Sequence, residues 1–415
     1  RVSLVKYLTF WNYQTCRPPQ KAILNDRSFW TGVLRTFYAG DDTVSADGNE
    51  NSHIELIRCM PAQEHQEALK RIKYYISKQQ SVAVLFRRGS QSINIELELL
   101  AQGMAYVSEL GSSVFDRREV FSVISLLRLA AGKLNDLAIP ERLKAWNAML
   151  RFPNIGLKSF RVDELASLLS SKTSFYGDAI REFVEELPEI SDWQKKQVVK
   201  RSSVIETIEA AELNSSDYVI KNYIELTDLY KKLEDLSLSK TNEEESVAGI
   251  DSMIMFLELK GFLPADAVAY IDKLKNGSDK KITSDTMVTL TTNHKSKGRE
   301  WPAVLIPGCT DNNYPYLRDD ELSVKSTIEE ERRLFYVALT RAINGVHIFS
   351  RTAGVSDEEK PSPFIDEMNF RESGIIGGYL SEGKYIELNA WLAKNKTSRP
   401  TRRYLESLKV SKSEC

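Results

Sequence analysis

The sequence predicts an α/β fold in which a parallel sheet with flanking helices is interrupted by an all-helical insertion. Three observations support this prediction. Short apolar runs at 53–59 and 81–86 alternate with stretches of helical periodicity, as in repeated strand–helix units. Strand patterns then stop between residues 137 and 282, where helical periodicity continues. They return at 287–291 and 303–307, so the chain re-enters the same kind of domain that it left.

Composition limits the classes of protein to be considered. The 415 residues are enough for two or three domains, and a hydrophobic fraction of 42% is enough to build their cores. The net charge of −2 provides no global positive field, so any binding of nucleic acid must come from local patches. The chain begins with Arg1, and we therefore expect a fragment, a processed chain or a trimmed one.

The cysteines and apolar runs exclude several kinds of site. The four cysteines, Cys16, Cys59, Cys309 and Cys415, lie far apart, so we expect no structural zinc, iron–sulfur cluster or disulfide framework. No apolar run reaches transmembrane length and no secretory signal is visible. These features predict a cytoplasmic protein with no membrane partner.

The first part of the chain predicts alternating strands and helices. We expect a strand near the start, a polar break at 12–20, a strand at 53–59 and a helix at 62–78. A strand at 81–86 is followed by the loop 87–92, a helix at 93–102 and a short strand at 105–107. Arg87 follows the strand directly. An arginine there could hold a phosphodiester backbone, or it could lie in a solvated loop.

The helical middle contains one turn of interest and two polar segments. Residues 153–158 read as a tight glycine turn between two helices, and such turns can present backbone N–H groups to phosphate. From the residues alone, Ile155 and Gly156 fit a plain helix connector better. We expect a loop at 240–246 and a linker at 277–281.

The stretch 286–343 carries the strongest pattern. Two predicted strands flank a polar loop that contains Thr292, His294, Lys297, Gly298 and Glu300. Lysine followed by glycine places a positive charge beside a backbone that a ligand can approach closely. The carboxylate of Glu300 could accept a hydrogen bond from a sugar hydroxyl.

A helix is predicted at 328–343, followed by a strand at 345–350. Glu329 and Glu330 stand in its first turn, where carboxylates favour the helix dipole, and they can pair with Arg333. Arg341 falls where the helix meets the strand. Spacing alone is also consistent with an ordinary amphipathic helix that carries surface ion pairs.

Taken together, these segments resemble the UvrD/Rep/PcrA family of superfamily 1 helicases. TTNHKSKGREWPAVLIPG resembles the family's motif V, and EEERRLFYVALTRA resembles motif VI nearly residue for residue. Other segments resemble family elements and occur in the same order along the chain. They are NYQT (motif IV), VAVLFRRGSQSINIELELL, FDRREVFSVISLLRL, NAMLRFPNIG and PSPF. The resemblance covers Val2 to about Met368.

The resemblance implies a domain plan. A RecA-like domain, 2A, would comprise residues 1–136 and 283–370, and a helical insertion, 2B, would comprise residues 137–282. Residues 371–415 would form a C-terminal tail. The family couples hydrolysis of ATP, with Mg²⁺, to stepping along single-stranded DNA, usually 3′ to 5′, and to opening duplex at single-strand/double-strand junctions.

The resemblance also implies roles for single residues. Arg341 would be the arginine finger, and Glu300 with Gly298 would lie at the nucleotide. Thr292, His294, Lys297 and Arg87 would face single-stranded DNA, while Ile155 and Gly156 would touch duplex phosphate. The motif IV position that normally holds a γ-phosphate arginine is Gln14, with Arg17 three residues away as a possible substitute.

Two further departures limit the expected activity. Arg299 replaces the usual leucine before Glu300. No GxxxxGK[ST] phosphate loop occurs, and no Asp-Glu magnesium motif precedes motif IV. The first RecA-like domain and the Mg²⁺ ligands are therefore expected to lie outside this chain, which alone should not hydrolyse ATP.

Three functional hypotheses remain open from the sequence. The favoured one is the C-terminal motor half of a DNA helicase. The alternative is a stand-alone, non-catalytic DNA-binding or regulatory module derived from a helicase. A helicase–nuclease subunit of the RecB or AddA type would need a nuclease pattern that the tail after Met368 lacks. RNA as the substrate stays possible at this stage.

Overall fold

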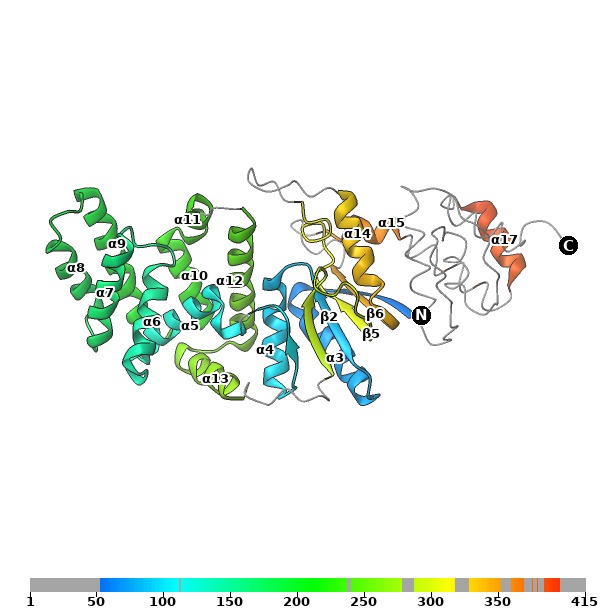
Figure 1. Cartoon of the computed structure of the whole chain (residues 1–415), viewed down its shortest axis with the longest axis horizontal. Helices are drawn as coiled ribbons and strands as arrows, with labels where there is room; N and C mark the ends of the chain where they lie inside the picture. Colours follow the sequence, from blue (N-terminus) through cyan, green and yellow to red (C-terminus); the bar gives the residue numbers. More distant parts are fainter. Residues whose placement is uncertain are drawn as a thin grey trace.

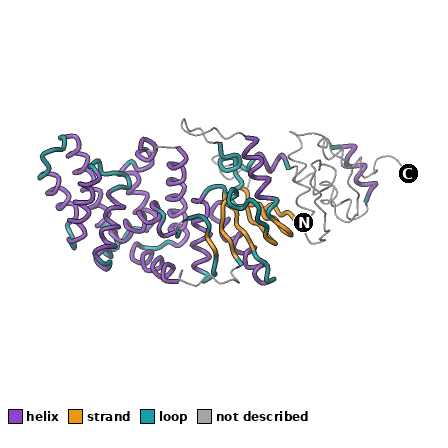
Figure 2. Tube along the Cα trace, viewed as in Figure 1, coloured by secondary structure: helices purple, strands orange, loops and turns teal. Residues whose placement is uncertain are grey.

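A computed structural model gives the fold of this chain (Figures 1 and 2). It describes residues 53–111, 113–236, 240–277, 287–317, 328–351, 360–368, 375, 379 and 384–395. The expectations for residues 1–52, including those for Gln14 and Arg17, lie outside the described residues. No helix in the described ranges is long and apolar enough to cross a membrane.

Six parallel strands form one sheet in the order β1-β6-β5-β2-β4-β3. β2 lies inside it, with β4 on one side and β5 on the other. Strands from before and after the helical insertion therefore pair with one another, which confirms the predicted α/β fold with a parallel sheet. The strands are β1 (His53–Cys59), β2 (Val82–Phe86), β3 (Val107–Ser108), β4 (Val288–Thr292), β5 (Trp301–Ile306) and β6 (Ala342–Arg351).

Helices cover both faces of the sheet, and the alternation of residues along β2 shows how. Val82, Val84 and Phe86 pack in one cluster with α3 and α4, whereas Ala83 and Leu85 pack in another with α14. All five side chains are fully buried, as expected for a strand with both faces covered. The covering helices are α3 (Pro61–Ser77), α4 (Ile93–Ala101), α14 (Ile328–Leu339), α15 (Pro363–Glu367) and α17 (Tyr385–Lys394).

The insertion is a separate helical layer beside the sheet (Figure 1). Its core is one continuous cluster of buried apolar side chains that includes Trp146 and Tyr223. α12 lies next to the sheet domain and contacts α4 and the 3₁₀ turn Gly89–Ser92. The helices are α5 (Arg118–Ala130), α6 (Ile139–Leu150), α7 (Ser159–Ser171), α8 (Tyr176–Glu185), α9 (Asp192–Glu209), α10 (Ser216–Thr227), α11 (Leu229–Leu236), α12 (Lys240–Lys260) and α13 (Pro264–Gly277).

Several predicted boundaries differ from the structure. The loop predicted at 240–246 is wrong, because these polar residues begin the long helix α12. The helix predicted at 328–343 ends at Leu339, and β6 begins already at Ala342. α5 precedes residue 137 yet packs in the same apolar cluster as the insertion helices. The division at residue 137 stays a prediction.

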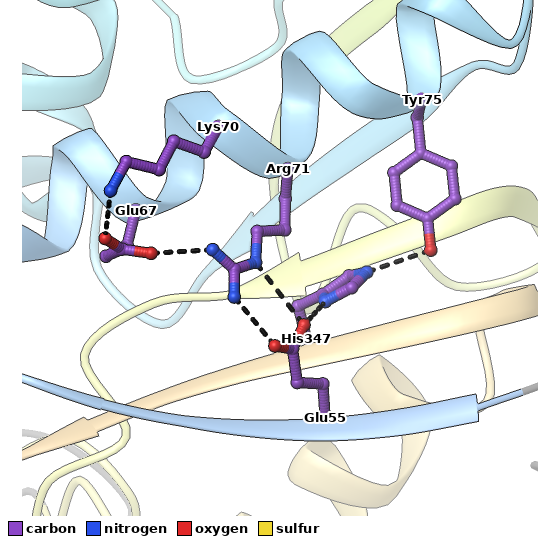
Figure 3. A network of polar contacts seen from close by, with 6 residues as sticks. All are labelled: Glu55, Glu67, Lys70, Arg71, Tyr75 and His347. Carbon is purple, nitrogen blue, oxygen red and sulfur yellow. Dashed lines mark hydrogen bonds and ion pairs between the residues drawn. The ribbon is translucent and has the colours of Figure 1, made fainter.

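A polar cluster fastens the strand β1 to the rest of the domain (Figure 3). Glu55 and His347 are direct neighbours across β1 and β6, with Glu55 Oε2 and His347 Nδ1 2.7 Å apart. The other ring nitrogen of His347 lies 2.9 Å from the Tyr75 hydroxyl of α3. Arg71, also from α3, donates to both oxygens of Glu55. The cluster therefore links two strands and one helix.

Replacing Glu55 by Gln should reduce stability at neutral pH but not in acid. Burial raises the pKa of Glu55, but hydrogen bonds and charge from Arg71 and His347 lower it by more, so the pKa lies below its ordinary value. The ionised carboxylate therefore stabilises the fold above the ordinary carboxyl pKa, and this contribution is lost as pH falls through the folded pKa. Since the side chain is 40% exposed, we expect about 1 kcal/mol or less.

Thermal unfolding at pH 7 and pH 3 measures this effect. The melting temperatures of wild type and Glu55→Gln should differ at pH 7, and the difference should become smaller as the pH is lowered to 3. Glu212→Gln, at an exposed position, is the control and should match wild type at both. A gap of equal size at the two pH values would contradict the linkage.

Candidate functional site

The connection from β4 to β5 is built from two buried anchors and several exposed side chains. The backbone N–H of Asn293 donates to Phe86 O (3.0 Å), and its side-chain amide donates to the Tyr314 hydroxyl (2.7 Å). The Ser296 hydroxyl donates to Asn293 O (2.7 Å). Asn293 and Ser296 are both fully buried. The loop thus has a fixed backbone, which fixes where its other side chains emerge.

Most of the predicted site residues in this loop have exposed side chains. His294, Lys297 and Glu300 are exposed, and Thr292 is half-buried at the end of β4. Gly298 has a φ of +84°, a left-handed conformation that favours glycine, and the space beside its Cα is open. The loop therefore presents a short polar row with an accessible backbone at its centre.

Two further cations of the loop are held by one acidic residue after β3. Lys295 Nζ donates to the backbone carbonyl of Glu109 (2.6 Å), and Arg299 forms an ion pair with the Glu109 carboxylate. The Arg299 guanidinium also lies 4.6 Å from the centroid of the Trp301 ring. Arg299, the departure from the family pattern, thus ties the loop to the sheet edge at β3.

Arg341 lies where α14 passes into β6, beside the start of β5. Its carbonyl accepts the N–H of Trp301 (2.9 Å), the first residue of β5. Its guanidinium donates to Val337 O (3.0 Å), to Thr340 Oγ1 (3.0 Å) and to Arg299 O (3.2 Å). Burial lowers the pKa of Arg341, and the nearby Glu300 carboxylate raises it. The structure therefore brings Glu300 and Arg341 together, although they stand far apart in the sequence.

Arg87 is buried and does not lie in a solvated loop. Its side chain is 4% exposed and forms a two-point ion pair with Glu331 of α14, at 2.9 Å from Nε and 2.7 Å from Nη2. Glu331 also accepts the backbone N–H of Tyr316 (3.1 Å). The solvated-loop interpretation is wrong. A phosphate contact would have to compete with this buried pair, and the assignment of Arg87 to DNA binding stays a prediction.

The neighbouring Arg88 opens onto a cleft of about 740 Å³ between α12 and the loops after β2 and β5. Arg88 donates to the Asn313 side chain (3.1 Å), and its guanidinium lies 5.1 Å from the Tyr316 ring centroid. From the insertion, Glu244 and Asp251 of α12 also line the cleft, and Glu244 Oε2 lies 4.0 Å from Arg88 Nη1. The cleft is thus polar and shared by the sheet and the insertion.

In the glycine turn of the insertion, the two residues assigned together to duplex phosphate have different environments. Ile155 is buried (4% exposed), whereas Gly156 is exposed with a φ of +93° and open space beside it. The Asn154 side chain accepts the N–H of Gly156 (2.8 Å). Gly156 is therefore available to a ligand, while the side chain of Ile155 anchors the turn.

Two residues that support this turn were missed from the sequence. The Tyr223 hydroxyl of α10 donates to Phe152 O (2.7 Å), and Arg201 of α9 donates to Pro153 O (2.6 Å). Arg201 stands in a polar helical segment, KKQVVKRSS, where nothing distinguishes it from its exposed neighbours. No sequence pattern could have found this contact, which joins residues 48 positions apart.

Within the described ranges, no group of His, Cys, Asp and Glu side chains could hold a metal ion. The expectation that Mg²⁺ ligands lie outside this chain stays a prediction.

Comparison with known proteins adds to this geometry. Residues 41–349 match the model of the UvrD-like helicase C-terminal domain. The chain is 24% identical over 337 residues to the ATP-dependent DNA helicase PcrA of Bacillus subtilis, covering 76% of this chain and 41% of that protein. It is 27% identical over 317 residues to the PcrA of Staphylococcus aureus, covering 70% and 40%.

The chain spans about two fifths of the length of these curated relatives. The matched segment includes all six strands of the sheet except the last residues of β6, together with the whole insertion. It also includes Glu300 and Arg341. Because the family model covers well over half of the chain, this chain belongs to the UvrD-like helicase C-terminal domain family.

Proposed function

We propose that this chain is the C-terminal motor half of an ATP-dependent DNA helicase or translocase that moves 3′ to 5′. The observation that carries the proposal is the juxtaposition of Arg341 and Glu300 at the starts of β6 and β5. The same loop that ends in Glu300 carries Thr292, His294 and Lys297. One short connection therefore joins a nucleotide-facing pair to a strand-facing row.

The two residues of the pair have distinct chemical roles in this proposal. Arg341 stabilises negative charge on a transferring γ-phosphoryl group, because its guanidinium keeps its charge at any physiological pH. Glu300 accepts a hydrogen bond from the ribose, and Gly298 leaves room for the nucleotide to approach. ATP with Mg²⁺ supplies the phosphoryl group. Three hydrogen bonds from Arg341 hold its guanidinium in place beforehand, which reduces the ordering cost.

In this proposal, the strand-facing row and the glycine turn bind DNA. Thr292, His294 and Lys297 would contact single-stranded DNA, and Gly156 would contact a phosphate of the adjoining duplex, so the substrate is a single-strand/double-strand junction. Gln14 and Arg17 stay proposed nucleotide contacts outside the described residues. The proposed partner is a RecA-like domain that carries the phosphate loop and the Mg²⁺ ligands.

This chain alone should bind a DNA junction without hydrolysing ATP. Phosphoryl transfer needs a phosphate cradle, a lysine and a metal site in addition to an arginine finger, and the sequence contains no GxxxxGK[ST] motif. Phosphate release should therefore stay at background with saturating ATP, Mg²⁺ and single-stranded DNA. Joining the chain to a family domain that contains the phosphate loop is the positive control. Robust turnover by the chain alone would refute this division of roles.

A further inference from the structure

The turn between α6 and α7 is held by donors from three different helices. Three consecutive backbone carbonyls of this turn each accept a side-chain hydrogen bond, and two of the three donors are guanidinium groups. The pairs are Arg118 to Arg151 O (2.9 Å), Tyr223 to Phe152 O (2.7 Å) and Arg201 to Pro153 O (2.6 Å). These carbonyls are thus directed toward the helical domain. The N–H groups of Ile155 and Gly156 also have acceptors within the chain, Leu150 O (2.9 Å) and Asn154 Oδ1 (2.8 Å), so any further partner of this segment has to use the N–H groups that follow Gly156.

Arg201 is unusual among these donors because it is buried without a carboxylate. Its exposed fraction is 6%, and its Nε–H has no hydrogen-bond acceptor in the structure. Its guanidinium lies 5.1 Å from the centroid of the Tyr223 ring, and no carboxylate of the described residues contacts it. Burial lowers its pKa, but an arginine still stays charged. A buried charge normally has a counter-charge, and here the described structure supplies none.

The other side of the turn offers unpartnered N–H groups. α7 has Lys158 as its N-cap, no side chain caps it, and its first turn contains no acidic residue. By contrast, α6, α8, α9 and α10 each have an acidic residue in the first turn. Among the described residues, the backbone N–H groups of 157–160 have no acceptor. The positive end of a 13-residue helix is therefore left without an anion.

The two features belong to the same short segment, because Arg201 contacts Pro153 and α7 begins at Ser159. Gly156, between Pro153 and the start of α7, has a positive φ, and a side chain added there would meet no atom within 4 Å, so a ligand can approach its backbone. The side chain of Gln194, in the first turn of α9, donates to Gly156 O (3.3 Å) and keeps this carbonyl turned to the protein. An anion beside Gly156 would have the N–H groups of 157–160 as donors, and the Arg201 guanidinium lies three residues away along the segment, at Pro153 O.

We propose that Arg201 is a positioning residue for phosphate binding at this turn, and that a backbone phosphate of duplex DNA supplies its missing counter-charge. The proposal rests on the assignment of the turn to duplex DNA made above. Arg201 acts in two ways. It fixes the Pro153 carbonyl, which sets the direction of the following N–H groups, and its charge attracts the phosphate through a low-dielectric interior.

If Arg201 only held the backbone of the turn in place, the expected result would differ. A donor to Pro153 O would then be sufficient, and the charge of the donor would have no effect on DNA binding. Charge and geometry can be separated by two substitutions. Arg201→Lys keeps the charge, whereas Arg201→Met keeps most of the side-chain length but removes the charge. Tyr223→Phe removes a neighbouring hydrogen bond to the turn without changing charge.

The test measures binding of the whole 415-residue chain to two labelled probes by fluorescence anisotropy. One probe is a duplex of about 18 base pairs with a 3′ single-stranded tail, and the other is the tail alone. We expect Arg201→Met to weaken binding of the tailed duplex about tenfold and to reduce the salt slope by about one, as for one lost phosphate contact. Arg201→Lys should stay within about threefold of wild type, and binding of the tail alone should not change.

Different outcomes refute different statements. Equal weakening by Arg201→Lys and Arg201→Met, or no weakening by either, overturns the role of the Arg201 charge. A wild-type chain that binds the tailed duplex no better than the tail overturns the assignment of the turn to duplex DNA, on which the proposal rests. If Tyr223→Phe weakens binding of the tailed duplex as much as Arg201→Met does, the geometry of the turn alone explains the effect and the role of the Arg201 charge is overturned.

A second measurement avoids substitutions, in case Arg201→Met does not fold. The buried Nε–H of Arg201 has no acceptor, so its resonance in an ¹⁵N-labelled sample is a local reporter. It should shift when the tailed duplex is added and should not shift with the tail alone. An unchanged resonance at saturating duplex would overturn the proposal.

Discussion

Replacing Arg341 by Ala should reduce ATP turnover by about 10³-fold or more in a protein that joins this chain to its phosphate-loop domain. The guanidinium is held by Val337 O, Thr340 Oγ1 and Arg299 O, so its position does not depend on bound nucleotide. Removal of such a preorganised charge acts on the transition state more than on the ground state. The turnover number should fall while KM for ATP changes little.

The control for this prediction stands on α14, the helix that precedes Arg341. Arg333 is exposed, and Arg333→Ala changes the net charge by the same amount as Arg341→Ala. It should leave turnover within about twofold of wild type. DNA affinity should be retained in both variants, since neither residue belongs to the strand-facing row. Near-normal turnover in Arg341→Ala would remove the arginine-finger assignment and favour the non-catalytic DNA-binding alternative.

α14 links this site to the carboxyl end of the inner strand β2. Glu331 stands in its first turn and pairs with Arg87 after β2, while Arg341 follows its last turn beside the start of β5. A helix of 12 residues is about 18 Å long, which is comparable to the length of a strand of this sheet. The helix thus fixes Arg341 at one end through a buried ion pair at the other.

The parts that were predictable from sequence depend on local periodicity. The run Val82–Phe86 has only apolar residues, and such a run is typical of a strand covered on both faces. The exposed residues of the loop before Glu300 were identified because lysine and glycine stand between two apolar strands. The similarity of 329–342 to the family's motif VI then located Arg341, which spacing alone could not distinguish from a surface residue.

The parts that were not predictable depend on contacts between distant residues. Arg87 and Glu331 are separated by 244 positions, and Arg87 alone looks like any loop arginine. The polar run at 240–246 resembles a loop because its side chains are hydrophilic, yet Glu245 of this helix accepts the N–H of Ser90 (2.9 Å). Tertiary contacts of this kind decide between helix and loop where propensity does not.

Replacing Glu331 by Gln should destabilise the chain by about 3–5 kcal/mol, because it leaves the Arg87 charge buried without a counter-charge. Burial alone lowers the pKa of Arg87, and the hydrogen bonds and charge of Glu331 reverse this effect. Glutamine keeps an oxygen that can accept the Tyr316 N–H, so the change isolates the loss of the ion pair. The free energy of unfolding from urea denaturation measures the effect.

A double variant separates the ion pair from the packing around it. Arg87→Met should be costly by itself, since it leaves the Glu331 carboxylate buried and unpaired. Combining Arg87→Met with Glu331→Gln removes both charges, and the double variant should therefore be more stable than either single variant. Single-variant losses below about 1 kcal/mol, or losses that simply add in the double variant, would show that the pair does not hold α14 to the loop after β2. Since α14 positions Arg341, the single variants should also reduce ATP turnover in the joined protein, and the double variant should recover more of the stability than of the turnover.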